Sequence, residues 1–281
     1  MNGLRVAEHA SDHGAWRIAS LAPTGALAAH VRAFNAYDEQ GAAFRRRELP
    51  DGLAVLIVNL GEELRVEQAG VVEAFGEGRA FFSGASSTYV LTETDGAQSG
   101  AQVKFTLLGA RLFLGKPLSE FGDALVEASL AWSLKANELR DRLAEAREQD
   151  ERVRLLAEAV QRRLAEAPAI APGLAFAFER LSRADIRIAD LARELGMGRE
   201  RFSKAFRREF GLPPKTFARV RRFARALRAR EREPWLDGAG LAAQCGYVDQ
   251  AHMIRDFQEF AGSPPSALWR RGLPDGGGFV D

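Results

Sequence analysis

Short apolar runs separated by turn residues fill the chain from about residue 31 to residue 113. Leu53–Asn59 and Val103–Leu108 are two such runs, rich in branched and aromatic side chains. Turn-forming residues divide the runs at Pro50–Gly52, Gly61, Gly76–Gly78 and Asp95–Gly96. Runs of this length and spacing predict several short strands, so we expect a small barrel or sandwich in this part of the chain.

From about residue 119 to residue 166 the pattern changes to helical spacing. Gaps of four and three residues alternate along Leu139, Leu143, Ala146, Asp150, Val153, Ala157, Val160 and Leu164. This spacing predicts one face of a long helix or of a helix pair. Two alternatives stay open for the face: packing against the β-rich part of the chain, or the seam of a homodimer. Asp150 weakens an uninterrupted coiled coil.

Two prolines and a glycine between residues 168 and 173 should end this helix, and we place a domain linker there. The pattern after the linker is helical as far as Gly272. The predicted fold class is therefore α+β, with an all-helical second domain. We divide the chain into a β-rich domain at 1–118, a helical segment at 119–167, a helical domain at 168–272 and a flexible tail at 273–281.

The helical domain contains one motif twice. In the first copy, Ile188–Leu195 has one apolar face, Gly196 can adopt the left-handed conformation that ends a helix, and Arg199–Phe210 forms the next helix. In the second copy, Gly240–Cys245 is the first helix, and Asp249 is a good N-cap for the helix that follows. The expected inner face of that second helix consists of Met253, Ile254, Phe257 and Phe260. Helix, glycine turn and helix form the helix-turn-helix shape.

The two copies also end alike. Gly211–Pro214 reads Gly-Leu-Pro-Pro and Gly262–Pro265 reads Gly-Ser-Pro-Pro, at almost the offset that separates the turn glycines, Gly196 and Gly246. Between the copies runs a predicted helix from Pro214 to about residue 230, roughly 25 Å long at about 1.5 Å per residue. Such a connector could hold two reading helices about one turn of DNA apart, ~34 Å.

The net charge of the whole chain is only +1, but the two halves differ, because basic residues are concentrated in the second half. Between residues 201 and 230 the basic side chains are numerous, and Glu209 is the one acidic residue. A basic stripe interleaved with apolar positions favours a polyanionic partner. Five arginines of the connector cannot all face the core of one helix, so we expect some of them to contact phosphate: Arg219, Arg221, Arg222, Arg225 and Arg228.

The second domain resembles the AraC/XylS class of transcription regulators. The resemblance covers about Ile188 to Arg271 and rests on IADLARELGMGRERFSKAFRREFGLPPKTFARVRRFARA and GLAAQCGYVDQAHMIRDFQEFAGSPPSALWR. It implies a sequence-specific DNA-binding regulator with a double-stranded DNA operator as its partner. RNA polymerase, a small-molecule effector and a second copy of the chain are further partners that the family allows.

The first domain resembles, more loosely, a sensor domain that is often fused to such readers. The matching stretches are Arg46–Gly52, Asn59–Gly61 and Leu107–Gly115. This resemblance implies a cupin-like β-domain that senses a small molecule or a protein, but it names no ligand. The alternative is a constitutive DNA-binding or architectural protein whose N-terminal domain only mediates oligomerisation or partner binding.

The family layout implies which residues meet DNA. Base-reading positions lie near the start of each second helix: Glu200, Arg201, Ser203, Lys204, Gln250, Ala251, His252 and Arg255. Arg and Lys can address guanine, Gln suits adenine and Glu can accept from cytosine. Because Ala251 is short, we expect the second copy to read one base fewer. Phosphate contacts are expected from Arg199, Arg207, Lys215 and Thr216.

The sequence offers little for other chemistry. A single cysteine, Cys245, excludes an internal disulfide and any multi-cysteine zinc site, and we expect it to be a core residue. We find no nucleophile elbow, no glycine-rich phosphate loop and no metal-ligand set, so we expect no enzyme activity, cofactor or metal. Without a long apolar stretch or a leader pattern, the sequence predicts a cytoplasmic protein with no membrane partner.

Overall fold

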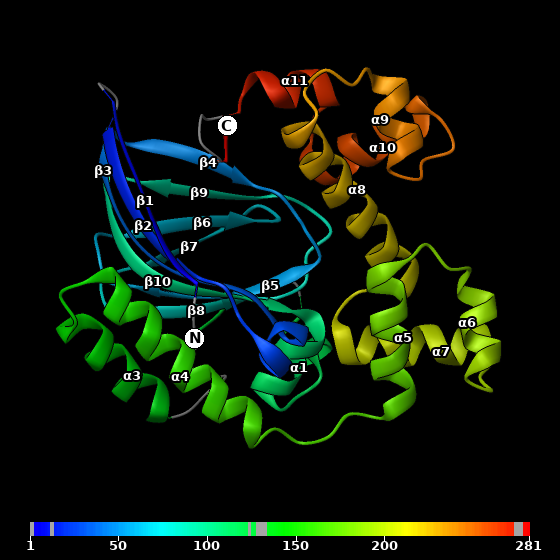
Figure 1. The fold of residues 1–281 in the computed structure, drawn as a ribbon, viewed down its shortest axis with the longest axis horizontal. Coiled ribbons are helices and arrows are strands. Elements are labelled where there is room, and N and C mark those ends of the chain that lie inside the picture. The colour runs from blue at the N-terminus through cyan, green and yellow to red at the C-terminus, as the bar shows by residue number, and fades with distance from the viewer. Residues whose placement is uncertain (1–2, 12–13, 123–124, 128–133, 273–277) are drawn as a thin grey trace.

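The computed structural model describes residues 3–11, 14–122, 125–127, 134–272 and 278–281. A β-rich N-terminal half is followed by helices, which confirms the predicted fold class (Figure 1). None of the helices in the described ranges combines the length and the apolar composition that a membrane span requires.

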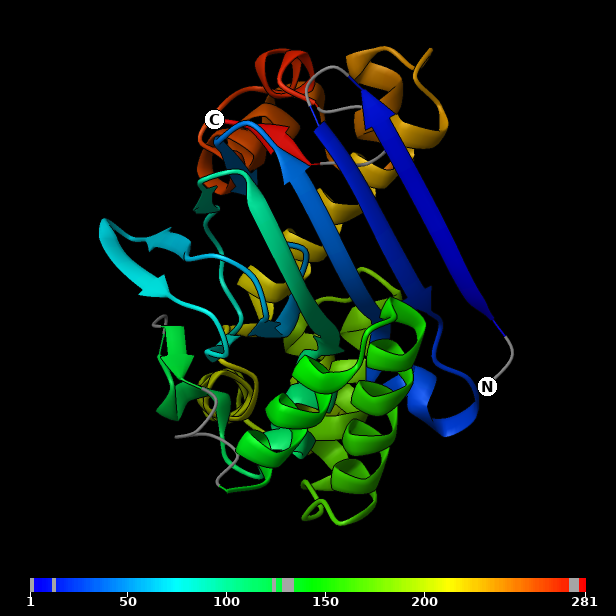
Figure 2. The same ribbon diagram turned by 90° about the vertical axis from the view of Figure 1, so that its left-hand side faces the viewer.

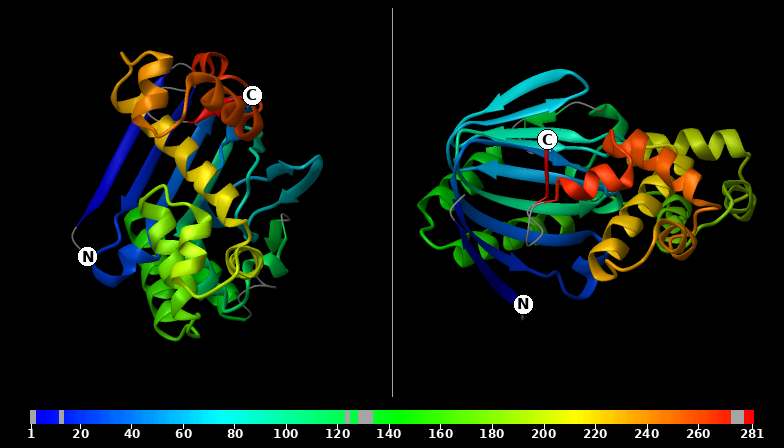
Figure 3. Two further views of the ribbon diagram at one scale, coloured as in Figure 1. Left: turned by 90° about the vertical axis from the view of Figure 1, so that its right-hand side faces the viewer. Right: turned by 90° about the horizontal axis from the view of Figure 1, so that it is seen from above.

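Two antiparallel sheets build the N-terminal half. The larger has the order β1 (Leu4–Ser11), β2 (Gly14–Leu21), β3 (Val31–Gly41), β10 (Ala97–Thr106), β5 (Leu53–Asn59), β8 (Ala80–Ser83) and β11 (Leu125–Glu127). The smaller has the order β12 (Phe279–Val280), β4 (Phe44–Glu48), β9 (Val90–Thr94), β6 (Leu64–Gln68) and β7 (Val71–Phe75). Seen from above, the strands curve round a common interior and the C-terminal helices lie to one side (Figure 3).

The apolar face of the larger sheet points away from the smaller sheet and is covered by helices. Phe34 on β3 and Val103 and Phe105 on β10 are buried beneath helices α1 (Leu107–Leu114) and α4 (Gln149–Ala165). Because side chains alternate along a strand, their neighbours point to the opposite side, toward the smaller sheet. Several of those neighbours are polar, so the main apolar core lies between sheet and helices, whereas polar and apolar side chains together line the interior between the two sheets.

The apolar face predicted between residues 139 and 164 is divided between α3 (Leu134–Glu145) and α4, which form a hairpin over the larger sheet (Figure 2). Leu143, Val153, Ala157 and Val160 are fully buried within the chain. The structure therefore favours packing against the β-rich domain over a dimer seam. These buried side chains are therefore not available to a homodimer seam.

Three expectations about local structure were wrong. Leu107 and Leu108, expected at the end of a strand, instead begin helix α1, because the Thr106 side chain caps its first turn by accepting from the Gly109 N–H at 3.0 Å. Strand β11 lies inside the segment expected to be helical, whereas β1 and β2 fall within the β-rich domain predicted at 1–118. The tail is not free throughout: β12 pairs with β4, whereas residues 273–277 lie outside the described residues.

The C-terminal half consists of seven helices in the described ranges. They are α5 (Pro172–Arg183), α6 (Ile188–Glu194), α7 (Arg199–Phe210), α8 (Pro214–Arg232), α9 (Gly238–Gln244), α10 (Gln250–Ala261) and α11 (Pro265–Arg270). Helices α6 and α7 form unit one, α9 and α10 form unit two, and α8 connects the units, as the repeated motif predicts. Two short 3₁₀ turns, η1 (Gly25–Ala29) and η2 (Leu118–Glu120), complete the fold.

Each unit has its own aromatic core. In unit one, Phe202, Phe206 and Phe210 are fully buried, and their cluster continues without a break into that of the N-terminal half. In unit two, Phe257 and Phe260 pack edge-on against Phe223 of α8 in a separate cluster.

An ion-pair network fastens α10 to α8. Arg219 donates to Asp256 at 2.7 Å and to Glu259 at 2.6 Å, and its guanidinium lies 4.9 Å from the centre of the Phe260 ring. The Asp256 side chain is only 1% exposed, whereas that of Glu259 is 53% exposed. The hydrogen bond to Glu259, with Asp256 adding to it, raises the pKa of Arg219 above its usual value.

We expect Asp256→Ala to lower the free energy of unfolding by about 2 kcal/mol, because it removes hydrogen bonds to a charged group in a dry site. Glu259→Gln is the matched control and should cost less than about 1 kcal/mol, since that partner is half exposed. Urea denaturation of the full chain measures both changes. Equal losses for the two variants would contradict the assigned importance of Asp256.

Candidate nucleic-acid interface

Unit one presents the start of α7 to solvent. Gly196 adopts φ +64°, which ends α6, and α7 begins at Arg199. At the other end of α7, Glu209 binds Arg111 of α1 at 2.6 Å, so this end faces the N-terminal half. The opposite end, with the predicted reading residues, therefore points away from that half. Glu200 and Lys204 are both about four-fifths exposed and pair at 2.7 Å.

The other reading positions of α7 differ in exposure. Arg201 is exposed, whereas Ser203 is half-buried between the apolar positions of the helix. The structure brings Glu200, Arg201 and Lys204 together at one exposed helix end. In the free protein, Lys204 is engaged by Glu200, so binding a base would require that pair to open.

Unit two repeats the geometry at α10. The Asp249 carboxylate accepts from the His252 N–H at 2.6 Å and caps the helix, as predicted. Gln250, Ala251 and Arg255 are exposed. His252 is half-buried and its ring stands edge-on to Tyr247 at 5.3 Å, so this residue takes part in packing as well as facing the surface.

The inner face of α10 differs from the predicted one at one position. Ile254 is 37% exposed, and the preceding turn carries Val248 at 88% exposure. Asp256 takes the buried place instead, because Arg219 pairs with it there. The apolar pattern alone therefore missed Ile254 as a surface residue of the reading helix.

The predicted phosphate contacts lie around α7 and the start of α8. Arg199, Arg207 and Lys215 are exposed, and Thr216 is half-buried. Arg199 opens α7, Arg207 lies in its last turn, and Lys215 and Thr216 belong to the first turn of α8. The N-terminal turn of a helix carries partial positive charge and free N–H groups, which suit a phosphate.

The arginines of the connector are mostly engaged within the chain. Besides Arg219, Arg225 binds Asp185 at 2.7 Å, and Arg222 lies 5.2 Å from the centre of the Tyr247 ring. Arg221 donates to the Asp51 carbonyl at 3.2 Å, and burial, helped by neighbouring arginines, lowers its pKa to about 10. Of the five predicted candidates, Arg228 is the exposed one.

A second candidate site lies between the two sheets. A cavity of about 480 Å³ is lined by side chains of both sheets, and its polar members include Ser20, Asn35, Tyr37, Glu39, Arg46 and Lys104. Arg46 bridges the sheets to Glu39 at 2.9 Å, and its Nε is buried with no acceptor among the described residues. Burial, with nearby Glu39, raises the pKa of Tyr37, so its hydroxyl stays a hydrogen-bond donor.

Other reactive groups are few. Across the described part of the chain, His, Cys, Asp and Glu side chains nowhere gather in threes in a way that could hold a metal ion. Cys245 is buried in the core of unit two, as predicted, and burial raises the pKa of its thiol.

Sequence reasoning also missed the contacts between the tail and the smaller sheet. Arg45, Arg47 and Asp281 connect β4, β12 and the end of α10. Three successive arginines in one short strand were the available signal, since such a run places charge on both faces of a sheet.

Comparison with known proteins gives two matching sequence families. A family described as a helix-turn-helix domain matches residues 191–271, and a domain of unknown function matches residues 19–127. No curated protein matches the chain.

Several solved structures are similar in fold. ToxT from Vibrio cholerae is 13% identical with a TM-score of 0.45, covering 80% of this chain and 95% of that chain. ToxT with a bound unsaturated fatty acid is 11% identical with a TM-score of 0.46, covering 84% and 94%. The AraC-like transcriptional activator CuxR is 16% identical with a TM-score of 0.35, covering 80% and 86%.

The family assignment rests on the helical domain. Both helix-turn-helix units, their glycine turns and the connecting helix are present in the structure, and the matched residues span them from Leu191 to Arg271. The chain therefore carries a helix-turn-helix domain of the matched family at residues 191–271, in agreement with the resemblance of its two units to AraC-type regulators.

Proposed function

We propose that this regulator reads two successive major-groove segments of a double-stranded DNA operator with α7 and α10, and that it responds to a small effector. The observation that carries the proposal is the pair of exposed helix starts joined by α8. At about 1.5 Å per residue, its 19 residues give a connector of about 28 Å, close to the ~34 Å of one DNA turn.

In unit one, Arg201 and Lys204 would address guanine, Glu200 would accept from cytosine, and Ser203 would contribute at the edge of the helix. In unit two, Gln250 would address adenine and Arg255 guanine, with Ala251 and His252 beside them. Four further residues would hold the DNA backbone and set the register: Arg199, Arg207, Lys215 and Thr216. In this assignment the exposed charged side chains contact DNA, whereas most arginines of α8 bind partners within the chain.

The cavity between the sheets supports the effector response. The interior of a small barrel is often filled by its own side chains. This one encloses a cavity of about 480 Å³, and its mixed lining includes Tyr37, Glu39, Arg46 and Lys104. The volume lies in the range of small-molecule sites. The effector would be a polar molecule with an oxygen acceptor, because the buried Nε of Arg46 lacks one.

We expect Lys204→Ala and Arg255→Ala each to weaken specific binding by about 1–3 kcal/mol and to relax preference at one base position. Selection from a randomised operator library, followed by fluorescence anisotropy, measures both effects. Arg193→Ala is the matched control, because this exposed arginine lies on α6 and pairs with Asp190 of its own helix. Unchanged base preference in both reading variants would refute the assignment.

The effector site has its own test. A thermal-shift screen of small polar metabolites should find compounds that raise the melting temperature of the full chain, because a ligand that binds only the folded state stabilises it. Lys104→Met should reduce that shift while leaving affinity for operator DNA unchanged in the absence of ligand. Lys116→Met, at an exposed position outside the cavity, is the control. A shift that survives Lys104→Met undiminished would place the ligand elsewhere.

A further inference from the structure

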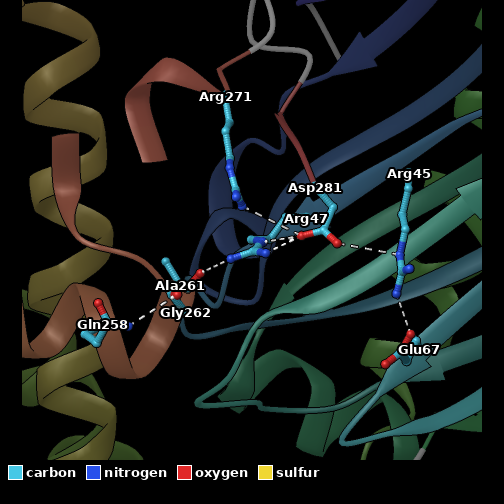
Figure 4. A network of polar contacts seen from close by, with 8 residues as sticks. All are labelled: Arg45, Arg47, Glu67, Gln258, Ala261, Gly262, Arg271 and Asp281. Carbon is cyan, nitrogen blue, oxygen red and sulfur yellow. Dashed lines mark hydrogen bonds and ion pairs between the residues drawn. The ribbon is translucent and has the colours of Figure 1, made fainter. Parts of the chain in front are cut away.

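Strand β4 has two faces with different partners. Phe44, Arg46 and Glu48 line the cavity between the sheets. Arg45 and Arg47 alternate with them and contact the tail and the end of α10 (Figure 4). Because neighbouring side chains of a strand point to opposite sides, one short element contacts both the effector site and the reader.

Arg47 makes the central contacts between β4 and the end of α10. Its Nη1 donates to the Ala261 carbonyl at 2.5 Å, at the last residue of α10, and its guanidinium also binds the Asp281 carboxylate. The guanidinium lies 4.3 Å from the centre of the Tyr89 ring, and Gly262 packs against the same tyrosine. The Arg47 side chain is only 9% exposed, so this charge depends on its partners within the chain.

The tail completes the contact. In β12, Phe279 pairs with Arg47 and Val280 with Arg46. The Val280 N–H donates to the Arg271 carbonyl at 2.9 Å, and the Asp281 N–H donates to the Arg45 carbonyl at 3.1 Å. The Asp281 carboxylate also lies within 4 Å of Arg45 and Arg271. The tail thus ties β4 to the segment after α11 (Figure 4).

The two units are attached to the N-terminal half in different ways. Unit one shares a continuous apolar cluster with it, in which Phe210 and Leu118 take part. Among the described residues, unit two has a separate cluster that meets the N-terminal half at partly buried Leu49 and the tail at Phe279. Apart from the contact of Gly262 with Tyr89, its end of α10 is held by the polar contacts of Arg47. Polar contacts exchange with water at small net cost, whereas opening a shared apolar core does not. Unit two is therefore the unit that can be released.

We propose that β4, β12 and Arg47 form a latch that holds unit two against the β-rich domain, and that an effector in the cavity opens it. The inference rests on the proposed function, because it assumes that α10 reads DNA and that the cavity takes an effector. The coupling is short: Gly278 of the tail lines the cavity beside Arg46, and Asp51 lines it while accepting from Arg221 of α8. A ligand that engages Arg46 acts directly on the strand whose other face carries Arg47.

The latch restrains the reader. While the latch is closed, α10 keeps a fixed position relative to the β-rich domain. Both units can then bind DNA together only if the distance between α7 and α10 matches the two groove segments. Opening the latch lets α10 settle into its own groove segment while unit one stays anchored. Breaking the latch should therefore raise affinity for a two-segment operator and leave affinity for a segment read by unit one unchanged.

The test compares Asp281→Asn with the wild-type full chain. Hydrogen exchange without DNA should show lost protection in β12, β4 and the end of α10, and affinity for the two-segment operator should rise about fivefold, the lower range of measured site coupling. Asp95→Asn is the matched control, since it removes a carboxylate that binds Arg65 on the same sheet, away from the tail. Glu39→Gln, which removes the partner of Arg46 inside the cavity, should lower protection of β12 in the same direction.

Each outcome decides something. Unchanged exchange in Asp281→Asn would overturn the latch whether or not the protein binds DNA. Unchanged protection of β12 in Glu39→Gln would overturn the link to the cavity. Lost protection with equal affinity changes on one-segment and two-segment DNA would overturn the restraint on unit two. If the wild-type chain showed no specific binding at all, the proposed function would fail, while the exchange result would still report on the latch.

A separate observation assigns a reading role to Ile254. It is exposed on α10 three residues beyond exposed Ala251, so the two side chains are neighbours on the helix surface. Small apolar side chains recognise the methyl group of thymine in the major groove. We infer that unit two reads thymine methyl groups with Ala251 and Ile254, between the polar contacts of Gln250 and Arg255.

Replacing single thymines by uracil in the operator tests this inference, because uracil lacks only the methyl group. At one or two positions of the unit-two segment, the wild-type chain should bind about fourfold more weakly, the effect of burying about one methyl group. Ile254→Ala should remove that difference at one position while keeping sequence-specific binding. Equal affinity for thymine and uracil throughout the segment would overturn the inference, and loss of all specific binding would instead refute the reading role of α10.

Discussion

The larger sheet buries its apolar face against α1 and α4, on the side away from the smaller sheet, and the rest of the structure depends on this arrangement. Phe34, Val103 and Phe105 need a cover of helices, and the helical hairpin supplies it within the same chain. The side chains between them must then face the smaller sheet. The interior of the barrel is therefore free to be polar, and a cavity can persist there without loss of the main core.

The same outward core anchors the reader. From Phe113 of α1 it continues through Leu118 to Phe210 and Phe217, so unit one is part of the N-terminal hydrophobic core. Unit two has no such continuity and depends on α8, on Arg219 and on the polar contacts of β4. A rigid first unit and a restrained second unit give the chain one fixed unit and one whose position can be adjusted. Under the proposed function, effector control would then have to move only one of the two units.

Local patterns predicted the reader well because its structure is local. Glycine turns at Gly196 and Gly246, the Asp249 cap and the two Pro-Pro exits are each specified within a few residues, and all are present. The N-terminal half was predicted only in outline, since strand pairing joins residues far apart, as β11 does with β8. The last residues, 278–281, were misjudged for the same reason: Asp281 binds Arg47, more than 200 residues away. Ile254 was misplaced because the buried charge of Asp256, paired across helices, overrides the apolar period.

The arginines show why charge alone describes such a protein poorly. The basic stretch that suggested a polyanion partner is divided by the fold into two populations. Arg219, Arg221 and Arg225 bind acceptors inside the chain and stabilise the connector. Arg199, Arg201, Arg207 and Arg255 remain exposed on the reading helices. Affinity for DNA should follow the second population, because a guanidinium already paired within the protein releases no counterion when it meets a phosphate. The connector can thus be rich in arginine and still act mainly as a structural element, and under the proposed function the choice of operator would fall to the two exposed helix starts.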